Sequence, residues 1–424
     1  MHPRTRTTIG MRQALLAAVL AGAAAGAVAQ APAAPTHGGP GTPGLKELFE
    51  AAWARQPEAL ALQSRREAAQ AQRRAAEAWT PEPPALEASH RTDRLTRNDG
   101  ARELEVGLAV PLWLPGERRS SGALAEAETA AVESRAQAAR VRLAAAVRES
   151  WWNWQRAGVD VEIARGQLDN ARKLAADVSR RARSGELARA DQHQADGAVA
   201  AAEAGLAQAE AAATAALQQV KALSGSPMGI TPAVMAAAEP EPAATEAGTH
   251  PAIAELQDRA SAAERTAVLA ATQSRSNPEL TLATTRDRGA SGERYGQTLT
   301  LAVRIPFGGG PRHDSRVASA RADAAEARAQ LALDRARLQS ERDAAVARVD
   351  AARVQLAAAE RRATLARETR GFFEKSFRLG ETDLPTRLRI DAEANEAERQ
   401  AARSRIELAA AISAWRQALG LLPQ

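Results

Sequence analysis

The sequence predicts a mainly α-helical chain with a smaller β contribution, built from two similar halves. Three observations support this prediction: an alanine-rich composition, two long stretches with heptad patterning, and landmarks that recur at a nearly constant offset. Aromatic residues make up 3% and charged residues 25% of the 424 residues. Alanine is the best helix former and lets helices approach closely. Long, closely packed helices are therefore expected instead of large globular cores.

Proline and glycine landmarks recur along the chain at offsets between 194 and 196 residues, which indicates an internal duplication. We predict a first structural repeat over residues 45–225, an equatorial linker over 226–248 and a second repeat over 249–424. Each repeat is expected to contain helices, a β-hairpin, a long helix and a return helix, in that order. The matched landmarks are Pro57 and Pro251, Pro83 and Pro278, Pro111 and Pro306, Gly185 and Gly380, and Pro227 and Pro423.

The first 29 residues read as a signal peptide, with a basic start, an apolar stretch and an Ala27-Val28-Ala29 cleavage pattern. A flexible spacer rich in Pro and Gly is expected over residues 30–44. The chain has no cysteine, so we expect no disulfide, no thiolate metal site and no lipid on a cysteine. No later segment approaches 18 uncharged apolar residues, so a membrane crossing would require a closed β-barrel.

Residues 103–112 and 298–305 alternate strictly between apolar and other residues, which predicts a β-strand in each half. Residues 86–91 and 279–285 are the expected hairpin partners. The apolar side suits lipid and the other side suits a water-filled lumen. Four strands cannot close a barrel, so more than one copy of the chain is needed. The apolar positions, which we expect to face lipid, are Leu104, Val106, Leu108, Val110, Leu299, Leu301, Val303 and Ile305.

The helical stretches have lengths that predict how they lie together. Short helices are expected over 45–55 and 57–79, long helices over 118–183 and 316–378, and return helices over 190–223 and 386–421. A helix of ~65 residues is roughly 100 Å long at its usual rise. Each repeat should therefore contain one continuous helical column and one broken column beside it. The heptad seam consists of Ala136, Leu143, Ser150, Ala157, Ala164, Ala171 and Val178, with Leu331, Leu338, Ala345, Ala352, Ala359, Ala366 and Phe373 at the same offset.

Charge and motif patterns exclude several classes of function. The 56 basic and 51 acidic residues alternate along the helices, which is typical of solvated helix faces and not of a nucleic-acid-binding patch. The six histidines are scattered and form no metal-ligand pattern. Gly308, Gly309 and Gly310 lack the lysine and hydroxyl residue of a phosphate loop. We therefore predict no enzyme activity, no cofactor and no metal site. Trp151, Trp152 and Trp154 are expected to pack and not to stack on a ligand.

The paired motifs resemble those of the TolC-type outer-membrane efflux family over essentially the whole mature chain. The motifs are "VPLWLPGE" and "VRIPFGGGP" after the second strand of each hairpin, and "RRARSGELARAD" and "SFRLGETDLPTRLR" at the glycine turns. The resemblance implies a homotrimer in the outer membrane of a Gram-negative bacterium. Long antiparallel coiled-coil helices would form its α-barrel in the periplasm, and four strands per chain would complete a shared twelve-stranded β-barrel.

The resemblance also implies partners and a docking site. The partners are a periplasmic adaptor protein, an inner-membrane RND-type pump and outer-membrane lipid. The finer likeness is to the heavy-metal branch, although Thr386 and Arg389 stand where many relatives have acidic residues. A drug-efflux or type I protein-secretion duct stays open, as does a periplasmic adaptor or structural coiled-coil protein. The turns implied to form the periplasmic tip and to dock the adaptor contain Arg183, Gly185, Glu186, Leu187, Asp191, Arg378, Gly380, Glu381, Asp383 and Leu384.

Overall fold

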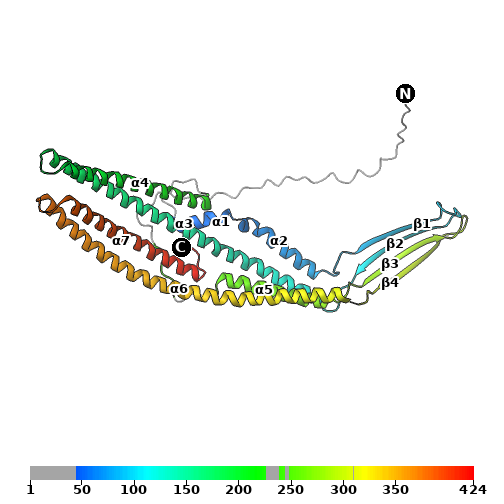
Figure 1. Ribbon diagram of the computed structural model, residues 1–424. Coiled ribbons are helices and arrows are strands. Elements are labelled where there is room, and N and C mark those ends of the chain that lie inside the picture. Colours follow the sequence, from blue (N-terminus) through cyan, green and yellow to red (C-terminus); the bar gives the residue numbers. More distant parts are fainter. Residues whose placement is uncertain (1–43, 226–237, 244–247, 309) are drawn as a thin grey trace, which may run out of the picture. The chain divides into compact units, whose positions relative to one another are not determined.

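The computed structural model describes residues 44–225, 238–243, 248–308 and 310–424. The predicted signal peptide, nearly all of the spacer and most of the linker lie outside the described residues. The first half contains α1 (Leu45–Ala54), α2 (Pro57–Glu77), β1 (Ala85–Thr92), β2 (Arg102–Pro111), α3 (Glu117–Arg183) and α4 (Arg189–Ser224) (Figure 1). The second half contains α5 (Pro251–Thr272), β3 (Glu279–Arg288), β4 (Gly296–Arg304), α6 (Gly310–Arg378) and α7 (Leu384–Ala418).

Local sequence chemistry sets where the helices begin and end. Pro57 and Pro251 stand in the first turns of α2 and α5, where a missing N–H costs nothing. Helix α7 begins at Leu384, two residues before the predicted start, because Pro385 is tolerated in the first turn and Asp383 caps the helix. At its other end α7 stops before Gly420, which has a left-handed φ of 76°.

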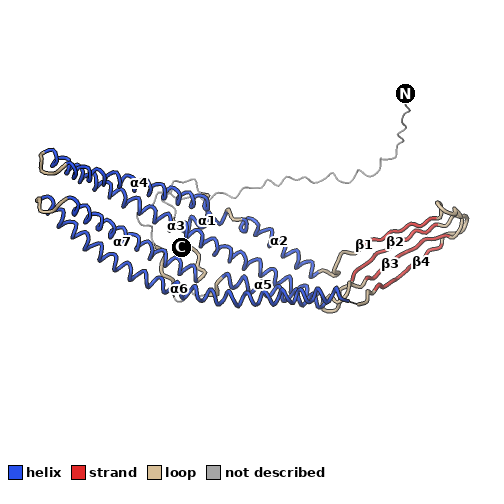
Figure 2. Tube along the Cα trace, in the orientation of Figure 1, coloured by secondary structure: helices blue, strands red, loops and turns tan. Residues whose placement is uncertain are grey.

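The long helices α3 and α6 each lie beside two shorter helices. Helix α3 packs against α2 and α4, and α6 packs against α5 and α7 (Figure 2). The predicted pairing of one continuous with one broken column in each half is thus confirmed. Contacts of α3 with α5 and α7 join the two halves. Every residue of the predicted heptad seam is buried or half-buried, as a coiled-coil seam requires.

The two halves differ in one element. Helix α1 has no helical counterpart among the described residues of the second half. At the 195-residue offset stand Pro240 and Pro242, and proline removes a backbone donor and clashes with the preceding turn of a helix. The segment at this offset from α1 falls largely in the predicted linker, and its described residues 240–243 are not helical.

The four strands form one antiparallel sheet in the order β1-β2-β3-β4. Both predicted hairpins are confirmed, β1 with β2 and β3 with β4. The structure adds the pairing of β2 with β3, in which Leu108 lies opposite Leu282. Gly107 permits a close approach at this junction, because a Cβ there would lie 3.0 Å from the Cβ of Ala283 and would force it to shift.

A cluster of large side chains lies midway along the long helices, and we call it the belt. Trp151, Trp152 and Trp154 of α3 are at most 6% exposed and pack with Phe49 of α1 and Ile406 of α7. The indole N–H of Trp152 donates to the Ser413 hydroxyl at 2.9 Å. The tryptophans are therefore core residues, which agrees with the packing role expected for them.

A buried charge network also lies in the belt. The Arg148 guanidinium donates to both carboxylate oxygens of Glu239 at 2.9 and 2.8 Å, and to Gln417 and the carbonyl of Leu421. Arg416 lies 3.5 Å from the same carboxylate and donates to the carbonyl of Pro240. The side chains of Arg148, Glu239 and Arg416 are at most 4% exposed. This network joins the described linker residues 238–243 to α3 and α7.

Candidate functional site: the two glycine turns and the sheet

The two glycine turns adopt the same backbone geometry. Gly185 has φ 81° and Gly380 has φ 79°, a left-handed conformation that side chains disfavour. The N–H of Gly185 donates to the carbonyl of Ala182, and the N–H of Glu186 donates to the carbonyl of Arg181. The same pair of bonds runs from Gly380 and Glu381 to Phe377 and Ser376. Both long helices thus end in a Schellman motif, as expected for a glycine just past a helix end.

The helices that follow the turns begin differently. Helix α7 has Asp383 as its N-cap, whose carboxylate accepts the Thr386 N–H at 3.1 Å. Hydrogen bonds from the Thr386 hydroxyl and N–H stabilise the ionised form and lower the pKa of Asp383. Helix α4 begins at Arg189, and its N-cap Ala188 has no capping side chain, although the Asp191 carboxylate accepts the Ala188 N–H at 3.0 Å.

The two turns are in contact with each other, and we call them, with the adjoining helix ends, the tip. The Arg181 guanidinium donates to the carbonyl of Phe377 at 3.0 Å and lies 5.0 Å from the centre of its ring. Phe377 is 2% exposed and packs with Val178 and Leu384. Of the sequence-predicted turn residues, Leu384 is therefore a core residue, and the structure leaves Arg183, Gly185, Glu186, Arg378, Gly380, Glu381 and Asp383 exposed.

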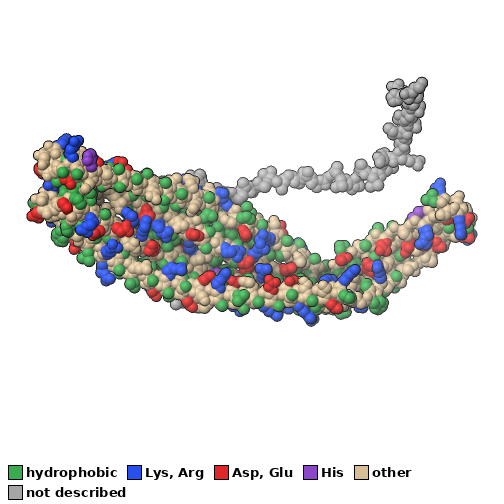
Figure 3. Space-filling model, in the orientation of Figure 1, with side chains coloured by type: hydrophobic (Ala, Val, Ile, Leu, Met, Phe, Trp, Pro, Cys, Tyr) green, Lys and Arg blue, Asp and Glu red, His purple; other side chains and the backbone are tan. Residues whose placement is uncertain are grey.

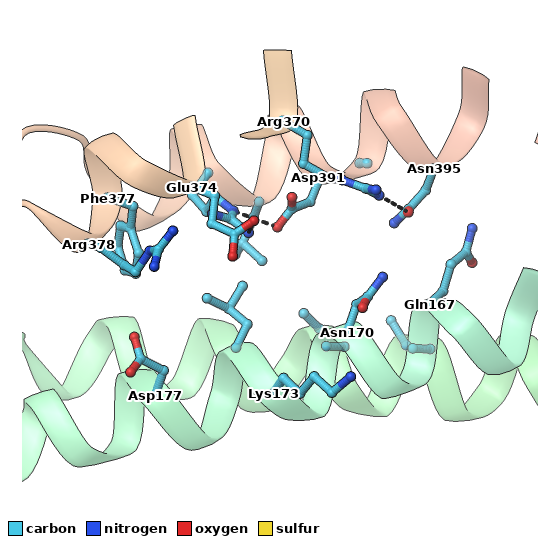
Figure 4. A pocket seen from close by; sticks show the side chains of 18 residues that line it. Gln167, Asn170, Lys173, Asp177, Arg370, Glu374, Phe377, Arg378, Asp391 and Asn395 are labelled. Atoms are coloured by element: carbon cyan, nitrogen blue, oxygen red, sulfur yellow. Dashed lines mark hydrogen bonds and ion pairs between the residues drawn. The ribbon is translucent and has the colours of Figure 1, made fainter. Parts of the chain in front are cut away.

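A groove of about 560 Å³ opens between the two helical pairs next to the tip (Figure 4). Its lining is mixed: alanine and leucine side chains lie beside the charged Lys173 and Asp177 on α3 and Arg370 and Glu374 on α6. Arg387 of α7 completes the lining. It donates to Asp391 at 2.9 Å and lies 3.7 Å from the Glu374 carboxylate. Arg387 is not among the sequence-predicted site residues, although its i,i+4 spacing from Asp391 indicates an ion pair on one helix face.

The acidic residues near the second turn have distinct positions. Asp383 caps α7 and Asp391 is bound by Arg387. Glu381 is exposed, and its carboxylate accepts a hydrogen bond from the Ser376 hydroxyl at 3.5 Å. Thr386 donates to Asp383, and Arg389 pairs with Glu393 at 2.6 Å. Among Glu381, Asp383 and Asp391, Glu381 is thus the acid with the weakest contact.

The sheet exposes its apolar side, where Leu299, Leu301 and Val303 are between 57% and 75% exposed. On the opposite side Ala109 and Ala283 of the inner strands are at most 3% exposed, whereas the edge strands β1 and β4 are exposed at every position. No helix of the described chain is packed over the sheet. Apolar exposure of this extent is unusual for a surface in water and marks a contact with lipid or protein. Ile305 lies one residue beyond β4, because Pro306 cannot continue the ladder.

Charged side chains of both signs are interspersed along the helices (Figure 3). Among the described residues there is no group of three or more His, Asp or Glu side chains that could hold a metal ion. None of the described helices combines the length and apolar character that a membrane crossing requires.

The chain is similar to outer-membrane channels of known structure. It matches VceC from Vibrio cholerae, described as an outer membrane protein, with a TM-score of 0.71 and 20% identity over 89% of this chain and 96% of that one. It matches CusC, whose structures are described in terms of folding and transmembrane channel formation, with a TM-score of 0.73 and 18% identity over 89% and 92%. The Neisseria gonorrhoeae MtrE outer membrane channel gives a TM-score of 0.72 and 16% identity over 89% of each chain.

At the level of sequence, no curated protein is significantly similar to the chain. A family comparison does give a match, to the family described as "Outer membrane efflux protein", over residues 48–226. Members of that family are channels and not enzymes, which agrees with the expectation that the chain catalyses no reaction. Residues 48–226 thus match the outer membrane efflux protein family, and the described chain has the fold of outer-membrane channels.

Proposed function

We propose that the chain is the outer-membrane channel subunit of a tripartite efflux system. The observation that carries the proposal is the sheet, which exposes an apolar face and has two unpaired edges, β1 and β4. Strands β1 and β4 run in opposite directions, so β4 of one copy would meet β1 of the next as an antiparallel pair. Repetition of this pairing closes a barrel without exposed edges. Three copies, the number implied by the resemblance, would supply twelve strands.

The helices also support an assembly of several copies side by side. Near the tip α3 contacts α4 and α7, and α7 contacts α6, so α4 and α6 are the outer helices of the set. Both outer helices expose a seam of small or apolar residues at heptad spacing, as expected for a coiled coil that lacks its partner. The α4 seam consists of Gly197, Ala200, Ala204, Ala207 and Ala211, and the α6 seam of Ala344, Ala347, Ala351, Val354, Ala358, Leu365 and Phe372.

In the assembled trimer, the tip would dock the periplasmic adaptor. The exposed turn residues are available for this contact, as the resemblance implies, and a proton-driven RND pump would supply the energy. The chain itself would conduct passively from the periplasm to the outside, as a non-lipidated outer-membrane protein that projects into the periplasm. We place the limits of the two repeats at 45–225 and 249–424, with the equatorial linker between them.

Cations, including heavy-metal ions, are the proposed cargo. On the lumen side of the sheet Arg91 pairs with Glu103 at 3.0 Å, and Arg304 lies 3.8 Å from Glu279. Glu87, Glu105 and Asp287 lie on the same side by strand alternation, and no ion pair with a described residue compensates them. This excess of carboxylates would favour cations in a barrel lumen. Drug efflux or type I protein secretion is the alternative within the same class.

An adaptor or structural coiled-coil role is the alternative from another class. Such an adaptor would have one helical hairpin flanked by β-rich segments. The described chain instead has two hairpins, α3 with α4 and α6 with α7, and one shared sheet. This architecture favours the channel.

A cysteine cross-link tests the assembly directly, because the chain has no native cysteine. Counted from the turns, Ala207 of α4 and Ala358 of α6 lie at similar heights along antiparallel helices. The Ala207→Cys/Ala358→Cys variant should form an SDS-stable trimer in the outer-membrane fraction on oxidation. Ala207→Cys/Ala344→Cys is the matched control, since Ala344 lies about 21 Å farther along the same seam. A monomer in the periplasmic fraction would overturn the channel assignment.

Cargo needs a separate experiment. A strain that lacks the gene should lose resistance to zinc, cobalt or cadmium, and reconstituted channels should show a cation-selective reversal potential. Glu87→Gln/Glu105→Gln/Asp287→Asn should reduce that selectivity. Sensitivity to drugs and detergents alone would reject the metal cargo and leave the channel assignment intact.

A further inference from the structure

The exposed face of the sheet changes its chemistry along the strands. Cross-strand partners share a face, so the pairing register sorts the side chains into rows. Three successive rows beginning at the helix end are apolar apart from one threonine. Their members are Val110, Leu280 and Val303; Leu86, Leu108, Leu282 and Leu301; and Ala88, Val106, Thr284 and Leu299.

Arginines replace the apolar residues at the loop end of the same face. Arg286 stands in the fourth row, and Arg102 lies opposite Arg288 in the fifth. The other members of these two rows are His90, Leu104, Gln297 and Thr92. The apolar region from Val110 to Leu104 spans about 20 Å at the usual rise of a strand, close to the height of an outer-membrane apolar band. The arginines therefore lie where that band ends.

Carboxylates are absent from this part of the face. Glu103 and Asp287 are sequence neighbours of the arginines, but alternation places both on the opposite face, where Glu103 pairs with Arg91. Within the described chain none of Arg102, Arg286 and Arg288 forms an ion pair. Three uncompensated positive charges thus lie side by side on a surface that is otherwise apolar.

Tyr295 holds two of these arginines in place. The Arg286 guanidinium lies 4.5 Å from the centre of the Tyr295 ring, and the Arg288 guanidinium 5.1 Å. Arg288 also donates from Nε to the carbonyl of Gly100 at 3.0 Å. Stacking on an aromatic ring leaves the guanidinium edges free to donate in its plane, and this geometry suits oxygen anions such as phosphate.

The helix end of the face has no comparable charge. The strands continue there into Leu112 and Ile305, which are 39% and 44% exposed, and Phe307 beyond them is 88% exposed. One boundary of the apolar region is therefore cationic and the other apolar. This asymmetry fits a membrane whose leaflet at the loop end is the more anionic one.

We propose that Arg102, Arg286 and Arg288, with Tyr295, bind the phosphates of an anionic membrane lipid in the leaflet at the loop end of the sheet. Three arginines side by side fit a lipid headgroup with more than one phosphate, and diphosphoryl lipid A is the probe of this class. The inference rests on the proposed function, because it requires the apolar face to lie in a membrane. It adds a lipid site that neither the fold nor the glycine turns imply.

The test measures lipid retention by the full-length assembled protein. Purified trimer in detergent is incubated with diphosphoryl lipid A, with phosphatidylcholine or with inorganic phosphate, and bound lipid is counted by native mass spectrometry. Lipid A should be retained and phosphatidylcholine should not. Arg102→Gln/Arg286→Gln/Arg288→Gln should weaken lipid A binding about a hundredfold, given the usual contribution of an arginine near a charged membrane surface.

Arg91→Gln is the matched control, since Arg91 is an exposed strand residue on the opposite face, and it should leave lipid A binding unchanged. If the triple variant does not assemble, Arg102→Gln alone should weaken binding about fivefold. Equal retention of lipid A by the triple variant and the wild type would overturn the proposal. It would also be overturned if inorganic phosphate bound the trimer as well as lipid A does. Fractionation separates the two levels: protein outside the membrane rejects the channel, whereas membrane-inserted trimer with unaltered lipid binding rejects the lipid site only.

Discussion

The belt and the tip both join the first half of the chain to the second, but they do so with different interactions. In the belt, tryptophans and a charge network that is almost fully buried connect α3 to α7 and to linker residues 238–243. At the tip the connection consists of one small apolar cluster around Phe377 and the contact of Arg181, beside an open groove lined by both charged and apolar side chains. The belt thus has the character of a domain core, whereas the tip has that of an adjustable contact.

This difference matters because burial sets the energy of each interaction. Removing one partner of a buried ion pair costs about 3–5 kcal/mol, whereas an exposed pair contributes about 0.2–1 kcal/mol. A channel that opens at its tip needs a fixed point from which the helices can move and an end that is held weakly. Substitutions in the belt and at the tip test this difference, and they are ordered from the largest expected effect to the smallest.

Glu239→Gln should have the largest effect, because it leaves the positive charges of Arg148 and Arg416 buried without their shared carboxylate. We expect a loss of about 3–5 kcal/mol in the free energy of unfolding, measured by urea denaturation of the purified trimer. Glu241→Gln is the control in the same segment. Its partner Arg353 and Glu241 itself are half-exposed, so the loss should stay below about 1 kcal/mol. Equal losses would show that the belt is not the fixed point.

Gly380→Ala should destabilise the tip because alanine does not tolerate a φ of 79°. Nothing lies within 4 Å of an added Cβ at Gly380 or at Gly371, so backbone conformation is the difference between the two sites. We expect a loss of about 1 kcal/mol for Gly380→Ala and a gain of about 0.5–1 kcal/mol for Gly371→Ala, which lies inside α6. Thermal unfolding measures both. The same sign for both variants would contradict the role of the left-handed turn.

A bulky residue at either glycine turn should affect adaptor docking at the tip without affecting assembly of the trimer. Gly185→Val and Gly380→Val should weaken cross-linking to the adaptor, while the SDS-resistant trimer persists, since the belt and the sheet are unaltered. Normal adaptor cross-linking in both variants would remove the docking role proposed for the turns.

Arg181→Gln should loosen the contact between the turns, because it removes both the bond to the Phe377 carbonyl and the ring contact. The loss, about 1 kcal/mol, should appear as faster hydrogen exchange in residues 178–188 and 376–386, with the belt unchanged. Arg180→Gln is the control, as Arg180 pairs with Asp177 within the same helix turn. Faster exchange in the belt as well would mean that the two regions are not independent.

Much of the fold could be predicted from the sequence, because the spacing of apolar residues and the glycines and prolines at the ends of elements are local signals. Alternation at Leu104 to Val110 predicted a strand, and Gly185 and Gly380 predicted helix ends. The pairing of β2 with β3 could not be predicted, since it joins segments from different halves and leaves no local pattern. The network of Arg148, Glu239 and Arg416 was also missed, because an isolated arginine on a charged helix reads as a solvated residue.

The candidate site shows the same limit. The turn residues were found from motifs, but the burial of Leu384 and the role of Arg387 depend on which helix lies opposite. Pro240 and Pro242 indicate from the sequence that the segment at the 195-residue offset from α1 does not form a matching helix. An internal duplication predicts the helices and strands that both halves share, but it does not predict an element that only one half has.

Acidification should have the smallest effect on the tip, where it would act on the cap of α7. The pKa of Asp383 is lowered by its hydrogen bonds from Thr386, so the ionised cap stabilises the start of α7. This stabilisation is fully present above the unfolded pKa of 3.8 and is lost as pH falls through the lower folded value. Hydrogen exchange at residues 384–388 should therefore rise at low pH, relative to the belt. Asp383→Asn keeps a capping side chain without the charge and should remove this pH dependence. If the variant keeps it, the titrating group is not Asp383, and Glu381, the other exposed acid of this turn, becomes the residue to replace next.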